Sequence, residues 1–269
     1  MQMSKEKPIA VVDERTHNER ILDQFTRQSA TFGERQTQDE MAHLMVRASG
    51  VAHGDTVLDI GCGAGIVTCA FAAVAGHVTG LDLTPAMLER AQNRQNELSL
   101  TNMTWQCGDV NALPFPDNSF SIVVTRNTFH HLLSPESVLA EMVRVCRPGG
   151  RIVVVDTTPD AAKLGDYDRF ETLLHPSHVH ALSLEDLLGL FTRANLLHIE
   201  STGHEIEKDF EFLLSGSSLN SGDAEWVRQW IHDDLSENRI GLGVHLKDER
   251  YFVSFPITIV AANKATQEG

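Results

Sequence analysis

The sequence is poor in basic and aromatic residues. Its 269 residues include 22 Lys and Arg against 37 Asp and Glu, which gives a formal net charge of −15 at pH 7. Because binding along a phosphate backbone needs clustered Lys and Arg, this charge argues against a nucleic-acid partner. Aromatic residues make up 6% of the chain and hydrophobic residues 42%, a composition typical of a soluble globular protein.

Cysteines are few and long apolar runs are missing. The 4 cysteines, Cys62, Cys69, Cys107 and Cys146, form no Cys-x-x-Cys pair or Cys/His metal pattern. They predict reduced core thiols in a cytoplasmic protein, without a bound metal. No stretch approaches 18 uninterrupted apolar residues, and residues 1–20 lack the apolar core of a signal peptide. The sequence therefore predicts neither export nor a membrane span.

Short β-branched runs alternate with helical patterns between about residues 56 and 158. This alternation is typical of βαβ units and predicts an α/β fold with a parallel sheet. Thr84 with Pro85, and Ser134 with Pro135, have the residue types of a helix N-cap followed by the first helical position. The predicted strands are 56–60, 77–82, 103–109, 120–127 and 151–158.

Both flanks of this region contain further elements. Residues 16–50 predict two helices. After residue 158, the pattern predicts helices near 160–174, 183–195 and 222–239, a strand near 197–210 and a final strand at 249–263. Pro256 in that final strand favours an edge position or a bulge, because proline lacks an N–H donor.

The most informative motif is a glycine-rich turn after the first predicted strand. Gly61, Gly63 and Gly65 allow a tight strand-to-helix turn and a close approach of a ligand to the backbone. The following helix N-terminus offers N–H groups and positive dipole to an anion. The dinucleotide-binding pattern would need glycine at position 66, where this chain has Ile66.

Acidic residues end the next two strands. Asp82 ends the second strand, where a carboxylate accepts hydrogen bonds from ribose hydroxyls, and Leu83 after it is able to stack on a base. Asp109 follows the third strand and is suited to accept from the exocyclic amine of adenine, with the N–H of Val110 as a donor to the ring. Since open α/β sheets bind ligands beyond the carboxyl ends of their strands, these positions predict an adenosine-containing ligand.

Taken in order, DIGCGAG, GLDLTPAML, GDVNALPF, RNTFHHL and RVCRPGG resemble the class I S-adenosylmethionine-dependent methyltransferases. Within them the chain is most similar to the small-molecule branch related to the ubiquinone and menaquinone methyltransferases, the methyltransferase type 11 domain. The resemblance covers roughly residues 20–158 and is looser afterwards. It implies a Rossmann-like, doubly wound seven-stranded sheet with its last strand antiparallel, and S-adenosylmethionine as cofactor with S-adenosylhomocysteine as product.

The resemblance also implies roles for particular residues. The turn from Gly61 through Cys62 and Gly63 would face the methionine part of the cofactor, and the backbone carbonyl of Arg126 would face its ammonium. The family often carries a Tyr in the N-terminal cap near the cofactor, and Phe25 and Phe32 are the candidate equivalents here. By the same analogy, Asp82 would bind the ribose, Leu83 and Val110 would contact the adenine, and Asp109 would bind its amine.

Histidines are the candidate catalytic residues. His130 and His131 follow the fourth strand, and we expect His130 to be structural, while His131 is a candidate base near neutral pH. His178, in a run with His175 and His180, is the second candidate base or hydrogen-bond donor, and nearby Tyr167 is suited to similar work. The three closely spaced histidines lack an acidic ligand among them, so we do not predict a metal site.

These observations predict an enzyme that transfers a methyl group to an O, N or C atom of a small molecule. Residues 1–50 would form a helical cap, 51–158 the cofactor-binding core, and 159–269 the rest of the sheet with substrate-covering insertions, all in one domain of a monomer or homodimer. Two alternatives stay open. The first is cyclisation or pericyclic chemistry with the same cofactor, and the second is a non-catalytic cofactor-binding subunit.

Overall fold

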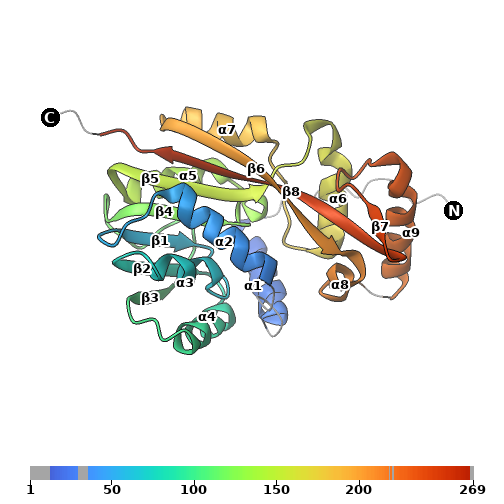
Figure 1. Ribbon diagram of the computed structural model, residues 1–269, viewed down its shortest axis with the longest axis horizontal. Helices are drawn as coiled ribbons and strands as arrows, with labels where there is room; N and C mark the ends of the chain where they lie inside the picture. The colour runs from blue at the N-terminus through green and yellow to red at the C-terminus, as the bar shows by residue number, and fades with distance from the viewer. Residues whose placement is uncertain (1–12, 30–35, 218, 220, 267–269) are drawn as a thin grey trace.

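The computed structural model describes residues 13–29, 36–217, 219 and 221–266. Its centre is one mixed sheet in which the strands run in the order β3-β2-β1-β4-β5-β8-β6, and β7 pairs with β8 (Figure 1). The strands are β1 (Thr56–Ile60), β2 (His77–Asp82), β3 (Met103–Cys107), β4 (Phe120–Arg126), β5 (Cys146–Thr157), β6 (Leu197–Asp209), β7 (His245–Lys247) and β8 (Arg250–Asn263).

Strands β1 to β5 are parallel, and β8 runs antiparallel to both of its long neighbours, β5 and β6. In the central pairs, Asp59 of β1 lies opposite Gly80 of β2 and Val124 of β4. This register brings the carboxyl ends of β1, β2 and β4 to one edge of the sheet. The predicted α/β fold with one reversed strand is therefore confirmed, and β7 adds a short hairpin to the seven predicted strands.

The position of Pro256 differs from the expectation of an edge or a bulge. β8 is an interior strand, and Pro256 lies opposite Glu205 of β6 in regular register. On the other side of β8, the pairing with β5 begins one residue later, at Ile257 with Thr157. The Pro256 carbonyl accepts from Thr158 N at 2.9 Å. Proline is tolerated here because its missing N–H falls where β5 has already ended.

Helices cover both faces of the sheet. On one face, α2 and α3 pack against apolar side chains such as Val57, Val78 and Val124. On the other face, α5 and α7 pack against Leu58, Val123 and their neighbours. The helices are α1 (Glu14–Gln28), α2 (Gln36–Ser49), α3 (Ile66–Ala72), α4 (Pro85–Glu97), α5 (Pro135–Val145), α6 (Leu164–Leu174), α7 (Leu184–Arg193), α8 (Phe210–Ser215) and α9 (Ser221–Glu237).

Local sequence explains several of these helices. Ser183 is the N-cap of α7 and accepts from Asp186 N at 3.1 Å, while Leu187 and Leu190 form its buried face. Thr84 and Ser134 are the predicted N-caps of α4 and α5, although neither side chain makes a capping hydrogen bond. In both helices a proline at the first position fixes a helical φ angle where no N–H partner is needed.

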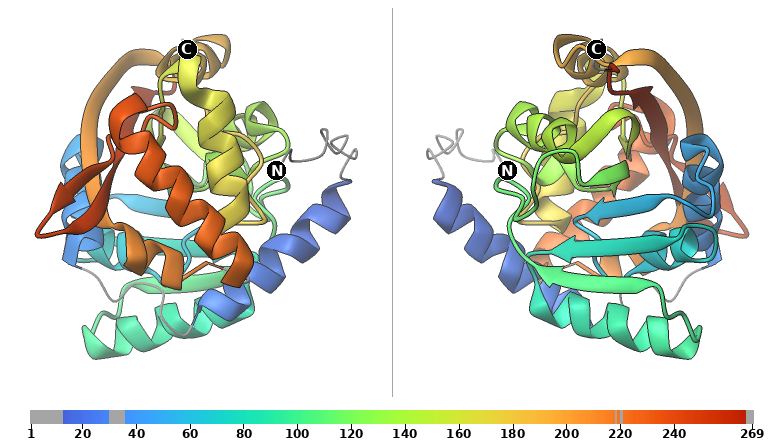
Figure 2. Two further views of the ribbon diagram at one scale, coloured as in Figure 1. Left: turned by 90° about the vertical axis from the view of Figure 1, so that its right-hand side faces the viewer. Right: turned by 90° about the vertical axis from the view of Figure 1, so that its left-hand side faces the viewer.

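Several elements lie beyond the carboxyl ends of the parallel strands. α1 runs beside this end of the sheet, and α6, α8, α9 and β7 form a lobe that extends further in the same direction (Figures 1 and 2). The long β6–β8 ladder supports this lobe, and α6, α8 and α9 bury Phe170, Phe210 and Ile231 against it. Of the described helices, none is long and apolar enough to cross a membrane.

Candidate functional site

A glycine turn joins β1 to α3 at the sheet edge. Gly61 has a φ angle of +64°, in the left-handed region that favours glycine. A Cβ atom at this position would lie 2.5 Å from the Thr128 hydroxyl oxygen, so the loop after β4 closes directly against the turn. Cys62 N donates to Leu81 O of β2 at 3.0 Å, which holds the turn beside the second strand. The backbone of this turn is thus exposed to the pocket without a side chain at Gly61.

Asp82, at the end of β2, is a buried carboxylate tied to the glycine turn. It accepts from Gly63 N through Oδ2 and from Thr84 N through Oδ1, both at 2.8 Å. Burial raises the pKa of Asp82, and the two backbone donors partly offset that rise. The two bonds leave lone pairs on both oxygens, which suits a ligand with two neighbouring hydroxyls.

Asp109, after β3, connects the sheet edge to the N-terminal helix. Its Oδ2 accepts from the Asn18 amide of α1 at 2.7 Å. Its Oδ1 accepts from the backbone N–H of Asn111 at 2.9 Å and from the Asn111 side-chain amide at 2.8 Å. Since each carboxylate oxygen accepts two hydrogen bonds, one position on Oδ2 is still available to a ligand amine.

Asp59 is a second buried carboxyl at this edge, in β1. Its residue exposure is 1%, and its Oδ2 accepts from the Thr68 hydroxyl of α3 at 2.6 Å. Burial, together with the nearby charge of Asp82, raises the pKa of Asp59 to about 7, against the opposing effects of Thr68 and Arg126. The ionised form of Asp59 is therefore the costly one in the ligand-free pocket.

One pocket joins these groups and contains nearly all of the predicted cofactor residues. It encloses about 1140 Å³ of space, part of it open to solvent. Phe25 of α1 also lines it, whereas Phe32 lies outside the described residues. The predicted cofactor residues in its lining are Gly61, Cys62, Gly63, Asp82, Leu83, Asp109, Val110 and Arg126. The Arg126 carbonyl, predicted to face an ammonium, accepts from the Thr128 hydroxyl at 3.2 Å.

His131 is the predicted catalytic residue that lies in this pocket. Its Nδ1 is 3.0 Å from both the carbonyl oxygen and the hydroxyl oxygen of Ser177, while Phe25 meets the ring edge-on. Because a carbonyl only accepts, Nδ1 carries the proton in the bond to that oxygen, which leaves Nε2 as the acceptor nitrogen. Burial and the neighbouring His130 lower the pKa of His131 well below its usual value, so the ring is neutral at pH 7.

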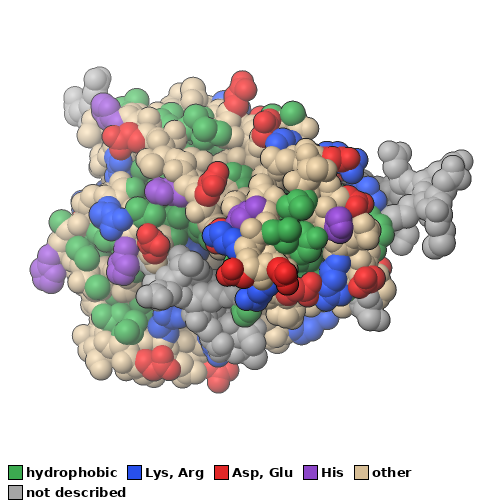
Figure 3. All heavy atoms as spheres, turned by 45° about the vertical axis from the view of Figure 1, so that its right-hand side comes forward, with side chains coloured by type: hydrophobic (Ala, Val, Ile, Leu, Met, Phe, Trp, Pro, Cys, Tyr) green, Lys and Arg blue, Asp and Glu red, His purple; other side chains and the backbone are tan. Residues whose placement is uncertain are grey.

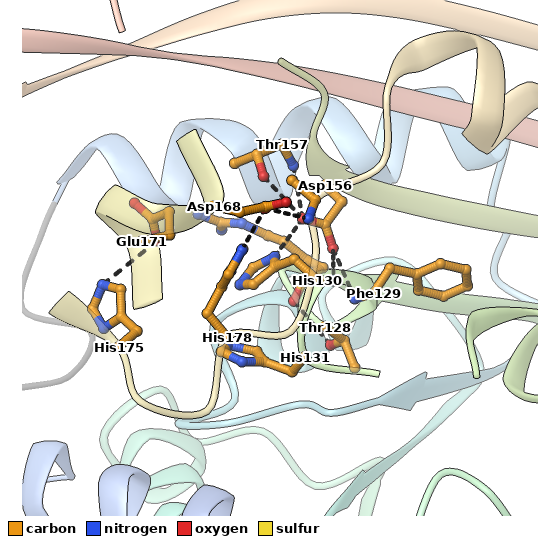
Figure 4. Close-up of polar contacts among 12 residues, drawn as sticks. Thr128, Phe129, His130, His131, Asp156, Thr157, Asp168, Glu171, His175 and His178 are labelled. Carbon is orange, nitrogen blue, oxygen red and sulfur yellow. Dashed lines mark hydrogen bonds and ion pairs between the residues drawn. The ribbon is translucent and has the colours of Figure 1, made fainter. Parts of the chain in front are cut away.

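His130, for which the sequence predicts a structural role, forms a buried pair with Asp156 of β5. Its Nδ1 is 2.5 Å from Oδ1 of Asp156, and Oδ2 of that carboxylate accepts from Phe129 N at 2.8 Å (Figure 4). Burial alone would lower the pKa of His130, but the charge of Asp156 raises it above its usual value. The pKa of Asp156 is correspondingly lowered by His130, against the effect of its burial. This ion pair fixes the loop that carries His131.

His178 does not reach the pocket. Its side chain is completely buried, and Nε2 is 2.7 Å from Oδ1 of Asp168 in α6 (Figure 4). His180 binds the other oxygen of Asp168, and His175 lies 3.9 Å from Glu171. Tyr167 is also buried outside the pocket lining. Among the described residues, no group of three or more His, Cys, Asp or Glu side chains is arranged to bind a metal ion.

Several residues of the site carry no recognisable signal in the sequence. His17 Nε2 donates to the His131 carbonyl at 2.6 Å, and Asn18 reaches Asp109 across 91 positions of sequence. α1 supplies both, and only its packing against the strand ends reveals them. Asp59 had a signal, because it stands two residues before Gly61 in the motif, but burial in the folded chain was needed to show its altered acidity.

Comparison with known proteins agrees with this architecture. Residues 58–154 match the family described as "Methyltransferase domain". An uncharacterized methyltransferase, YcgJ of Bacillus subtilis, is 32% identical over 157 residues, 58% of this chain and 62% of that protein. Demethylmenaquinone methyltransferase of Tropheryma whipplei is 38% identical over 109 residues, 40% of this chain and 44% of that protein. The predicted methyltransferase resemblance is confirmed for the matched region, while the chain spans less than two thirds of these relatives.

Solved structures extend the likeness in fold to most of the chain. A putative methyltransferase from Bacillus halodurans has a TM-score of 0.78 at 24% identity, over 84% of this chain and all of that one. The cyclase SpnF has a TM-score of 0.60 at 19% identity, over 85% of this chain and 82% of its own. A geranyl diphosphate C-methyltransferase from Streptomyces coelicolor, in complex with S-adenosyl-L-homocysteine, scores 0.58 at 18% identity, over 84% and 76%. These likenesses establish the fold.

Proposed function

We propose that the protein is an S-adenosylmethionine-dependent methyltransferase that acts on a small molecule. One observation carries the proposal: the glycine turn, Asp82 and Asp109, at three successive strand ends, line a single pocket. Three different kinds of hydrogen-bonding group are thereby offered to a ligand that contains an amino acid, a ribose and an adenine. The match of residues 58–154 to a methyltransferase domain supports the same proposal.

The residues of this pocket fit that cofactor. The space at Gly61, where a Cβ would meet Thr128, leaves bare backbone for the methionine part. Asp82 has lone pairs for the ribose hydroxyls, and Asp109 has one for the adenine amine, beside Leu83 and Val110. When bound, S-adenosylmethionine would supply an electrophilic methyl group on a positively charged sulfur. The protein's part is to orient the acceptor and exclude water, effects worth roughly 7–11 kcal/mol in well-aligned reactions.

His131 is our candidate for contact with the acceptor. The Ser177 carbonyl holds its proton on Nδ1, so Nε2 accepts a hydrogen bond from an O–H or N–H of the substrate. Its lowered pKa keeps the ring neutral at pH 7, so Nε2 is free of a proton, and the ring is a weak base toward the proton that the acceptor loses. His178, the other sequence candidate, is more suited to a positioning role, since its contact with Asp168 fixes the segment that contains Ser177.

The charges in the pocket favour an uncharged or cationic acceptor. The lining contains the acidic residues Glu14, Asp59, Asp82 and Asp109, and Arg126 is the one Lys or Arg among the described lining residues. Ile21, Phe25 and Leu132 add apolar surface on the side of α1 and the loop after β4. A phosphorylated acceptor would have to be desolvated here against surplus negative charge.

Titration calorimetry with S-adenosylmethionine and with S-adenosylhomocysteine tests whether the protein binds the cofactor. Methyl transfer from labelled S-adenosylmethionine to a panel of small phenols, amines and acids then tests the reaction. We expect binding at micromolar concentrations and a product one methyl group heavier than the acceptor. His131→Ala should reduce turnover by about 10²-fold or more, as expected for loss of a proton acceptor, with S-adenosylhomocysteine affinity unchanged. Failure to bind either ligand would reject the proposed function.

The likeness in fold to a cyclase supports one second candidate, a reaction that uses the bound cofactor without consuming it. The same pocket would then hold S-adenosylmethionine as a source of positive charge. Mass spectrometry separates the two functions, because a cyclised product has the mass of its substrate. Recovery of intact cofactor after many turnovers would favour this candidate over methyl transfer.

A further inference from the structure

Residues 175–181, which lie between α6 and α7 and which we call the strap, connect the lobe to the pocket. Ser177 of the strap is completely buried and contacts two other parts of the chain. Its N–H donates to Oε1 of Gln24 in α1 at 3.0 Å, and its carbonyl accepts from Nδ1 of His131 at 3.0 Å. The orientation of the His131 ring therefore depends on where the strap places Ser177.

One carboxylate in α6, that of Asp168, holds the strap from the side of the lobe. Its Oδ1 accepts from Nε2 of His178 at 2.7 Å (Figure 4) and from Ala181 N at 2.8 Å, and its Oδ2 binds Nδ1 of His180. The His178 side chain is completely buried, whereas that of His180 is 52% exposed. Burial alone would raise the pKa of Asp168, but hydrogen bonds from His178 and Ala181 lower it below its usual value. Asp168 is therefore ionised at neutral pH and accepts from all three donors of the strap.

His178 has a single favourable place for its ring proton in this network. Its Nδ1 is buried and has no hydrogen-bond partner among the residues that the structure describes. A proton on that nitrogen would lack an acceptor, so the proton is on Nε2 and is donated to Asp168. Without Asp168 this N–H would be buried and unpaired, which is costly. The strap, with Ser177 next to His178, would have to shift to give the N–H a new partner.

We propose that Asp168 is a positioning residue for His131. Through the strap it holds Ser177 where the Ser177 carbonyl keeps the His131 proton on Nδ1 and leaves Nε2 as the acceptor. The proposal rests on the proposed function, because that function gives His131 its contact with the methyl acceptor. Asp168 itself is not among the described residues that line the pocket. The backbone N–H of Val179 also donates to the His130 carbonyl at 2.8 Å, so loss of Asp168 should displace the strap without detaching it.

Nitrogen–proton correlation spectra of the histidine rings test this positioning directly, because they show which ring nitrogen carries the proton. The full chain is used without cofactor or acceptor, and the His131 signal is identified by its loss in His131→Ala. We expect the proton on Nδ1 in wild type and at least partly on Nε2 in Asp168→Ala. In methyl transfer, Asp168→Ala should lower kcat by about 10–100-fold and leave the affinity for S-adenosylhomocysteine unchanged, because misplacing a reacting group costs rate.

Two matched variants separate the strap contacts from the charge and from the helix. Asp168→Asn keeps one side-chain oxygen, which is able to accept from His178 and Ala181, and loses the acceptor for the exposed His180. We expect it to keep the wild-type position of the ring proton and most of the wild-type kcat. Asp166 lies in the same helix and makes none of these bonds, so Asp166→Ala should behave like wild type.

His178→Phe provides a second route to the same result if Asp168→Ala does not fold. The phenyl ring fills the space of the imidazole without its N–H donor, and we expect the same movement of the His131 proton. A proton that stays on Nδ1 in both variants would overturn the inference. Equal losses of kcat in Asp168→Asn and Asp168→Ala would overturn it as well, because the charge would then matter and the strap contacts would not. Failure of wild type to bind S-adenosylmethionine would instead reject the proposed function, since the spectra need no ligand.

Discussion

Gly61 shows how one missing side chain makes room for the site. Its φ is +64°, and a Cβ added there would lie 2.5 Å from the Thr128 hydroxyl oxygen, so both features oppose any larger residue. We expect Gly61→Ala to lower the free energy of unfolding by about 1–3 kcal/mol, the usual range for a strained backbone position. Cofactor affinity should fall as well, because the loop after β4 must move. Urea unfolding and calorimetry with S-adenosylhomocysteine measure the two effects.

Gly54→Ala is the matched control for that variant. A Cβ at Gly54 meets nothing within 4 Å, and its φ angle lies outside the left-handed region. Its unfolding free energy and ligand affinity should stay within about 0.5 kcal/mol of wild type. Equal behaviour of the two alanine variants would contradict the geometry assigned to the turn.

Asp156 is the residue whose loss should destabilise the site loop most. Asp156→Ala leaves His130 and the N–H groups of Phe129 and Thr157 without their acceptor. Breaking a buried pair on one side costs about 3–5 kcal/mol, which urea unfolding at pH 6 would detect. Asp117→Ala, which removes an exposed partner of Arg144, is the control and should cost about 0–1 kcal/mol.

The same pair predicts a pH window. The pKa of Asp156 is lowered in the folded state, so its stabilisation is present above its unfolded pKa and is lost as the pH falls through the lowered value. The pKa of His130 is raised, so its stabilisation is present below about pH 6.5 and is lost as the pH rises through the raised value. The stability difference between wild type and Asp156→Ala should therefore peak between about pH 4 and 6.5. A difference that grows above pH 7 would contradict the pairing.

At the scale of elements, α1 is attached to the pocket by a small number of polar contacts. Asn18 binds Asp109, His17 binds the His131 carbonyl, and Gln24 accepts from Ser177 N at 3.0 Å. Asn18→Ala removes a hydrogen bond to a charged group, worth about 1.5–3 kcal/mol, and we expect at least a tenfold loss of S-adenosylhomocysteine affinity. Limited proteolysis should also cleave α1 faster.

Arg20→Ala tests whether that effect is specific. Arg20 lies on the exposed side of the same helix, so its replacement should change neither ligand affinity nor the rate of cleavage. If Asn18→Ala and Arg20→Ala behave alike, the contact with Asp109 does not hold α1 on the pocket.

Most of the elements themselves were predictable. The predicted strands at 56–60 and 77–82 coincide with β1 and β2, because buried parallel strands are short, rich in β-branched residues and bounded by glycine. Pro256 was misjudged, since the rule for proline concerns the hydrogen bond it lacks, and the local sequence does not show that β5 ends beside it. Which helix packs on which face likewise depends on partners far along the chain.

At the scale of the whole molecule, β8 makes residues 58–154, the region that matches a methyltransferase domain, depend on residues 250–263. Residues 250–263 lie between β5 and β6 and pair with both. A chain ending at residue 158 would expose the interior edge of β5, with Val153 and Val155 uncovered on one face. We expect this fragment to aggregate or to lack cooperative unfolding by urea, whereas the full chain unfolds cooperatively. A fragment that unfolds cooperatively would show that the core is a separate domain.

The net charge of −15 also belongs to this scale. On the face shown in Figure 3, Lys and Arg side chains are interspersed with Asp and Glu rather than gathered in a stripe. This distribution fits the expectation that a phosphate backbone is not the partner. Among the described residues that line the pocket, however, acidic side chains outnumber basic ones. Three of these acidic residues, Asp59, Asp82 and Asp109, lie at or just beyond the carboxyl ends of the strands.

The seven predicted strands, the glycine turn, Asp82 at the end of β2 and Asp109 after β3 follow from the sequence alone, because they depend on local backbone requirements and on a fixed order of motifs. Tertiary structure was needed to show which histidine lines the pocket: His131 does, and His178 is buried against Asp168. Tertiary structure was also needed to show that burial raises the pKa of Asp59 and that Asn18 donates a hydrogen bond to Asp109. Burial and contacts between distant segments determine these properties, and neither can be read from the residues that stand next to them in the chain.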